Sequence, residues 1–196
     1  MSTTQTRATD PARDDRRVRT ATTAADREVA YEEFGAPDGR PVLFLHGTPG
    51  SRLLGGLYDE EGRRQGVRIL AVDRPGFGQS DPWPGRRPAD VGQYVAPVLA
   101  DAGVSTVGVV AFSGGGIDAL ALAETRPEVV ESVDLVSGAV PASMGDPPRL
   151  LSTLATLANA TPLLVKGLYR TQAWAAGRAS PSFVVSQFTT EDCPDE

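Results

Sequence analysis

The chain has 196 residues, of which 40% are hydrophobic and 22% are charged, a balance typical of a globular protein rather than a disordered one. Its net charge of −6 at pH 7 argues against nucleic acid as a partner, because binding phosphates requires a basic surface. Cys193 is the only cysteine, which excludes a disulfide within the chain.

Membrane and export signals are also weak. No apolar stretch approaches the ~20 residues that span a bilayer, and the first thirty residues lack the apolar core of a signal peptide. The pair Arg16-Arg17 has no apolar segment behind it. We therefore expect a cytoplasmic protein that acts on a small molecule, with neither a membrane nor a nucleic acid as partner.

Strands and helices are predicted to alternate along the chain. Residues 1–15 are polar and without periodicity, which predicts a flexible tail, and two short extended segments follow from residue 16. One helix is predicted over 88–102, and a second follows the apolar run 106–111 and ends at about residue 124. Further helices are predicted after Pro141, where leucines recur at helical spacing. Apolar runs of strand length occupy residues 41–45, 68–72, 106–111 and 129–136.

The apolar runs are continuous rather than alternating, which indicates strands buried on both faces, as in parallel sheets. Strands that alternate with helices predict right-handed crossovers and a mainly parallel sheet with helices on both faces. The predicted fold class is α/β, and we assign the core to residues 16–141.

The residues with distinctive chemistry follow the ends of these strands, where active sites of open α/β sheets gather. Ser113 lies between a strand and a helix with small residues, Ala111 and Gly115, two positions before and after it. A nucleophile elbow needs this spacing, because larger side chains would collide with the neighbouring strand and helix. The helix N-terminus also offers free N–H groups to an oxyanion. We predict the Gly114 N–H and the Thr48 N–H as the two donors.

Three motifs in this order resemble the α/β-hydrolase family: Leu45-His46-Gly47, the loop Asp73–Ser80 and the elbow at Ser113. The likeness is to the capped branch, which holds esterases, proline iminopeptidase-like enzymes and epoxide hydrolase-like proteins. It implies hydrolysis of an ester, amide or related bond through an acyl-enzyme on Ser113, without a metal or an organic cofactor. It also implies that residues 142–196 begin a helical cap.

One part of the family pattern is missing. The family also uses an acid and, near its C-terminus, a catalytic histidine, whereas His46 is the only histidine here. We assign His46, with Gly47, to support of the oxyanion loop, and Asp146 is the nearest candidate for the acid. We therefore expect a chain cut off inside its cap and inactive. The apolar strand 129–136 would then be an open edge available for self-association.

Several alternatives stay open. The chain could be a non-catalytic remnant or a binding protein. The segment Val109–Asp118 also resembles the phosphate loop of ATP pyrophosphatase-type enzymes, although its aspartate comes one residue late. We expect Asp118 to be solvated. Asp73 and Arg74 could form an exposed salt-bridged turn or a wall of the active site, and we favour the structural role. The apolar stretch 150–169 fits a cap helix better than a membrane or partner helix.

Overall fold

A computed structural model describes residues 18–138 and three single positions, Thr161, Gly167 and Thr171. The chain divides into two compact units, Met1–Pro141 and Ala142–Glu196. In the second unit Gly167 and Thr171 are helical. The predicted tail, the candidate acid Asp146 and most of the predicted cap lie outside the described residues.

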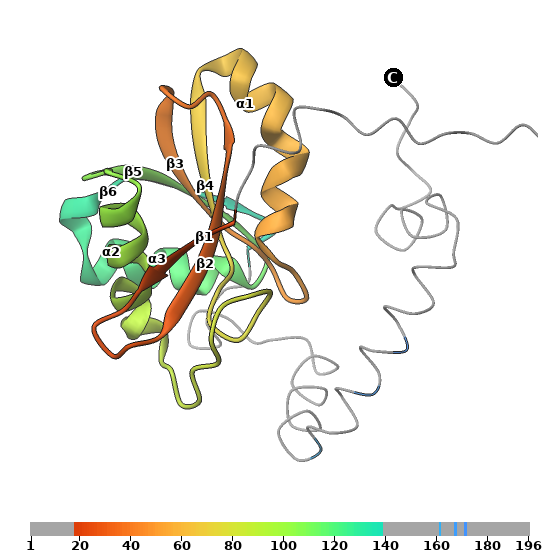
Figure 1. Ribbon diagram of the computed structural model, residues 1–196, viewed down its shortest axis with the longest axis vertical. Helices are drawn as coiled ribbons and strands as arrows, with labels where there is room; N and C mark the ends of the chain where they lie inside the picture. The colour runs from red at the N-terminus through yellow and green to blue at the C-terminus, as the bar shows by residue number, and fades with distance from the viewer. Residues whose placement is uncertain (1–17, 139–160, 162–166, 168–170, 172–196) are drawn as a thin grey trace, which may run out of the picture. The chain divides into compact units, whose positions relative to one another are not determined.

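The first unit is built on one sheet of six strands, in the spatial order β1-β2-β4-β3-β5-β6 (Figure 1). The four strands β4, β3, β5 and β6 run parallel, and β2 and β1 continue the sheet in antiparallel pairing. The predicted α/β class with a mainly parallel sheet is confirmed. The strands are β1 Arg19–Thr22, β2 Glu28–Gly35, β3 Arg40–Leu45, β4 Val67–Val72, β5 Val107–Phe112 and β6 Val130–Val136.

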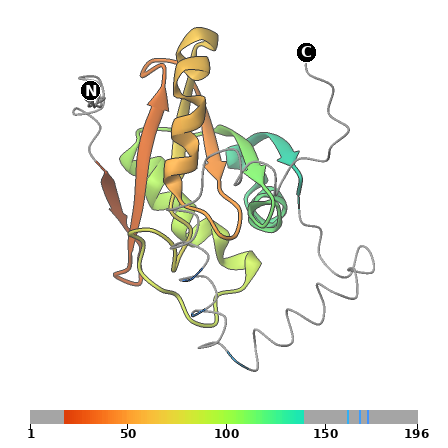
Figure 2. The same ribbon diagram turned by 90° about the vertical axis from the view of Figure 1, so that its right-hand side faces the viewer.

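Helices cover both faces of this sheet. The α1 helix (Asp59–Gln65), with the 3-10 helix η2 (Arg52–Tyr58) before it, lies on one face, and α2 (Val91–Asp101) and α3 (Gly115–Thr125) lie on the other (Figures 1 and 2). Short 3-10 turns precede α2 and β6, namely η3 Pro88–Asp90 and η4 Pro127–Val129. The main apolar core fills the α2 and α3 side, and a smaller cluster of Phe34, Phe44, Ile69 and Ala71 fills the other. Among the described residues, no helix has the length and apolarity to cross a membrane.

Helix α1 was not foreseen from the sequence, because its residues carry no apolar periodicity. It is held instead by a side-chain ion pair between Arg63 and Asp59, 3.1 Å apart one turn along the helix, and by a glycine contact. A Cβ at Gly62 would lie 3.0 Å from the Cα of Gly35 on β2, so a side chain at this position would push α1 and β2 apart. The helix ends at Gly66 with φ 66°, a left-handed conformation that glycine adopts without strain.

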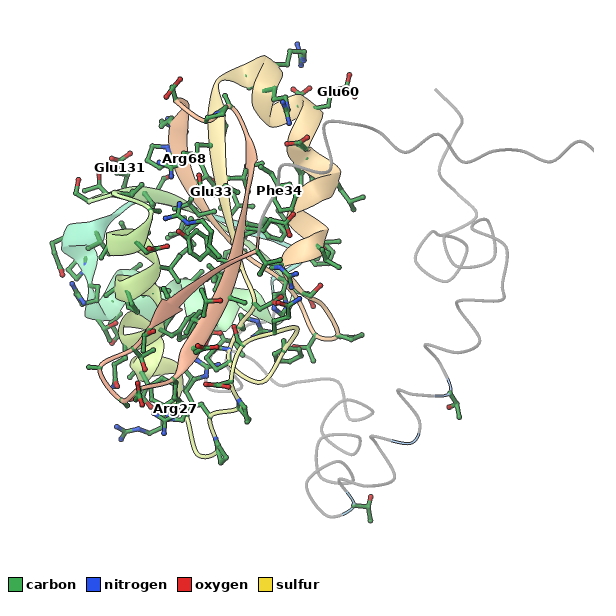
Figure 3. The ribbon with its side chains drawn as sticks, viewed as in Figure 1. Arg27, Glu33, Phe34, Glu60, Arg68 and Glu131 are labelled. Atoms are coloured by element: carbon green, nitrogen blue, oxygen red, sulfur yellow. The ribbon has the colours of Figure 1, made fainter. Side chains whose placement is uncertain are left out.

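Strand β2 shows why the antiparallel side of the sheet is stable. Glu33 and Phe34 point to opposite faces (Figure 3), and Arg68 on β4 donates to Glu33 at 2.6 Å. Burial alone would raise the pKa of the Glu33 carboxyl, but the hydrogen bond and charge of Arg68, helped by Arg19, lower it. Phe34 packs in the smaller apolar cluster. The β2–β4 pair is therefore fixed by a shielded ion pair on one face and by apolar packing on the other.

Candidate active site

Ser113 lies directly after β5, and α3 begins two residues later at Gly115. Its φ is 50°, in the left-handed region that costs an L-residue roughly 1–2 kcal/mol. The Ser113 N–H donates to the carbonyl oxygen of Val136 at 2.9 Å, and the Ser113 carbonyl accepts from the Gly116 N–H at 3.0 Å. The expected strained turn between a parallel strand and a helix is confirmed.

Small residues around Ser113 permit the close packing of this turn. A Cβ at Gly115 would overlap the carbonyl oxygen of Leu45 on the neighbouring strand β3. A Cβ at Gly47 would lie 3.1 Å from the Ser113 Cβ and 3.3 Å from the Phe112 ring. Each contact is tighter than side chains normally adopt. The small-residue spacing therefore has the steric origin that the sequence suggested.

The loop after β3 meets the elbow at the same end of the sheet. A Cβ at Gly114 would lie 3.6 Å from the Thr48 backbone nitrogen and 3.1 Å from the Thr48 hydroxyl oxygen. Within residues 18–138, neither the Thr48 N–H nor the Gly114 N–H donates a hydrogen bond to another group. The Thr48 and Gly114 amides thus belong to segments that lie close together beside Ser113, and neither amide has a partner among residues 18–138.

His46 is fully buried, and both of its ring nitrogens are engaged. The Arg74 backbone N–H donates to Nε2 at 3.1 Å, so Nε2 carries no proton. Nδ1 lies 2.7 Å from the Gly47 carbonyl oxygen and is therefore the protonated nitrogen of a neutral ring. Burial lowers the pKa of the imidazole, and the nearby Arg74 charge lowers it further. The edge of the ring packs against Phe77, so neither nitrogen is free to take a proton from Ser113.

Comparison with known proteins identifies the family. A family model described as alpha/beta hydrolase fold matches residues 40–183. The chain belongs to this family. It is 33% identical over 106 residues to the AB hydrolase superfamily protein YisY of Bacillus subtilis, covering 53% of this chain and 40% of that protein. It is 32% identical over 114 residues to a proline iminopeptidase of Neisseria gonorrhoeae, covering 55% of this chain and 36% of the other.

A solved structure agrees with this assignment. The thermophilic esterase from Thermogutta terrifontis superposes with a TM-score of 0.60 at 25% identity, over 74% of this chain and 53% of the esterase. The chain thus spans less than half the length of the two curated relatives.

In this α/β-hydrolase core, Asp73 at the end of β4 is a structural centre. It is completely buried and accepts hydrogen bonds from the backbone N–H and the guanidinium of Arg52, each at 2.7 Å, and from the Gln79 N–H at 2.9 Å. Arg52 also pairs with Glu32 at 3.4 Å. The expected structural role fits these contacts. The notion of an exposed turn is wrong, because Asp73 and Arg74 are both buried.

The expectation that Asp118 is solvated is also wrong. Asp118 is 2% exposed and accepts from Arg86 at 2.8 Å, from the Tyr94 hydroxyl at 3.1 Å and from Arg74 at 3.3 Å. Helical periodicity could have predicted that Asp118 is buried, since residue 118 shares a helix face with the buried residues 115, 119 and 122. Burial, followed by the Asp118 charge, raises the pKa of Tyr94 well above its ordinary value.

The described part of the α/β-hydrolase chain offers no cluster of three or more His, Cys, Asp or Glu side chains that could hold a metal ion.

Proposed function

We propose that the chain carries the nucleophile and oxyanion hole of a serine hydrolase that acts on an ester, amide or related bond of a small molecule. Ser113 would attack the carbonyl carbon and lose its proton to a base, which passes that proton to the departing alcohol or amine as the acyl-enzyme forms. Water would then hydrolyse the acyl-enzyme, releasing the acid and restoring the serine hydroxyl. The observation that carries the proposal is the left-handed serine between β5 and α3. Membership of the family and the likeness to an esterase and a proline iminopeptidase support it.

The proposed oxyanion hole consists of the Thr48 and Gly114 N–H groups. Their adjacency and their lack of partners among residues 18–138 support this role. The Gly114 N–H also lies at the N-terminus of α3, where the helix dipole favours a developing negative charge. In serine proteases, one such donor contributes about 10²–10³ in turnover.

We further propose that the 196-residue chain does not turn over substrate at enzymatic rates. A serine hydroxyl needs a base within hydrogen-bond reach, and the only imidazole of the chain is His46. Its engaged ring nitrogens fit support of the oxyanion loop, together with Gly47. Loss of the base lowers turnover about 10⁶-fold in a serine protease.

The second candidate function is a non-catalytic one, in which the fold binds a small molecule without turnover. This candidate is favoured by His46, because both of its ring nitrogens already have hydrogen-bond partners. A phosphate-binding loop at 109–118 is less well supported, because Asp118 is turned inward onto arginines. The cytoplasmic location also remains a proposal.

The first test is release of p-nitrophenol from p-nitrophenyl acetate by the purified chain and by Ser113→Ala and His46→Ala variants. We expect no turnover by the wild type above the Ser113→Ala background. Turnover near ~10 s⁻¹, a typical enzyme value, that both substitutions abolish would make His46 the base and overturn the inactivity proposal.

The nucleophile needs a separate test that does not depend on turnover. A fluorophosphonate probe would be offered with imidazole as an external base, which accepts the serine proton as the oxygen–phosphorus bond forms and fluoride leaves. We expect a covalent adduct on Ser113, located by peptide mass spectrometry, in the wild type and in a Ser132→Ala control. Ser132 is an exposed serine on β6. Equal labelling of many serines would contradict a nucleophile elbow at Ser113.

A further inference from the structure

Arg74, the second residue of the loop after β4, connects the two halves of the proposed oxyanion hole. Its side chain is 7% exposed. Nη2 donates to the Thr48 hydroxyl at 2.6 Å and to the Gly47 carbonyl at 3.1 Å, and Nη1 donates to the Gly114 carbonyl at 3.4 Å. We infer that Arg74 is a positioning residue that aligns the Thr48 amide beside the start of α3, an inference that rests on the proposed function.

Peptide geometry explains how these contacts act on the amides. The Gly47 carbonyl and the Thr48 N–H belong to one planar peptide unit and point in opposite directions. The Gly47 oxygen accepts from the buried guanidinium and from His46 Nδ1, and fixing it fixes the direction of the Thr48 N–H, away from Arg74. The direction of the Gly114 N–H is fixed independently of Arg74, since the Ser113 carbonyl of its peptide unit accepts from the Gly116 N–H.

The guanidinium is itself held in place by charge and packing. Asp118 accepts from Nη1 at 3.3 Å, and the guanidinium carbon lies 4.9 Å from the centre of the Phe77 ring. A planar fork with several donors can bind two separate backbone segments at once, whereas a lysine ammonium offers one point charge. Arg74 thus joins the end of β3, the end of β4 and the start of α3 at a single group.

Arg86 provides a matched comparison within the same cluster. It donates to Asp118 through both terminal nitrogens, at 2.8 and 3.2 Å, and so shares the carboxylate partner of Arg74. No hydrogen bond of the described residues joins Arg86 to Gly47, Thr48 or Gly114. Removing Arg86 therefore removes one positive charge beside Asp118 without touching the amides.

The test compares the 196-residue chain with its Arg74→Gln, Arg74→Lys and Arg86→Gln variants by two measurements. The first is ¹⁵N relaxation of the Thr48 and Gly114 amides. We expect order parameters near about 0.85 in the wild type and in Arg86→Gln, and below about 0.6 at Thr48 in both Arg74 variants. Arg74→Lys keeps the charge that Asp118 needs, so it remains informative if Arg74→Gln does not fold.

The second measurement is the rate of fluorophosphonate labelling of Ser113 with imidazole present. We expect the maximal rate in the Arg74 variants to fall about tenfold to hundredfold, with an unchanged probe concentration for half-maximal rate. Arg86→Gln should label at the wild-type rate.

The two measurements separate the two ways of failing. No selective labelling of Ser113 in the wild type would refute the proposed function, and the relaxation data would still decide whether Arg74 orders the loop. Two results would overturn the positioning role. One is that the Thr48 order parameter and the Ser113 labelling rate change equally in Arg74→Lys and in Arg86→Gln. The other is that they change in neither variant.

Discussion

The buried, neutral His46 predicts that the protein loses stability as the pH falls below neutrality. Burial lowers the imidazole pKa in the folded chain, whereas the unfolded chain titrates near about 6.5. The unfolded state therefore binds more protons between these two pKa values. The stability due to neutral His46 is complete above pH ~6.5 and declines as the pH falls toward the folded-state pKa.

The size of the effect follows from this linkage. At pH 5.5 an unfolded histidine is about ten-elevenths protonated, which lowers the free energy of unfolding by up to about 1.4 kcal/mol relative to pH 7.5. For a chain of this size that corresponds to a fall in Tm of roughly 3–6 °C. The neighbouring carboxylates of Asp73 and Asp118 are paired with arginines.

The assay is thermal unfolding followed by circular dichroism between pH 7.5 and 5.5, for the wild type and for His46→Gln. The glutamine can accept the Arg74 N–H but does not titrate, so we expect a lower Tm that is nearly independent of pH in this window. Because His46 is the only histidine, no other imidazole obscures the comparison. A wild-type Tm that stays level or rises on acidification would refute a buried neutral His46.

Three further predictions concern stability and assembly. Ser113→Gly should be about 1–2 kcal/mol more stable than Ser113→Ala in urea unfolding, because glycine accepts the left-handed φ; equal stabilities would argue against that backbone. Arg52→Met should lower the free energy of unfolding by about 3–5 kcal/mol, since it leaves the Asp73 carboxylate buried without its ion-pair partner. Arg63→Met, at a half-exposed ion pair, should lower it by less than about 1 kcal/mol. The chain should self-associate through the outer edge of β6, as measured by light scattering after gel filtration. Leu135→Lys, at a residue 41% exposed, should weaken this self-association, and a monodisperse wild-type monomer would contradict the prediction.

Most of the sheet could be predicted from the sequence, because its signals are local. Buried parallel strands are short continuous apolar runs, and each predicted run lies within about one residue of an observed strand from β3 to β6. The elbow at Ser113 was equally readable, since the need for small neighbours depends only on the strand-to-helix turn. Helix α1 could not be predicted in this way, because a glycine contact and ion pairs stabilise it and neither produces a periodic pattern of apolar residues in the sequence.

The sequence by itself determined the α/β class, the place of Ser113 at the end of a strand and the absence of any imidazole other than His46. Only the tertiary structure decided what the charged residues do. Arg74 and Asp118 are 44 positions apart, so nothing local in the sequence shows that they form a buried pair. A buried charge is tolerated only with a partner, and that partner is set by how the carboxyl ends of β3, β4 and β5 meet beneath the loop that follows β3.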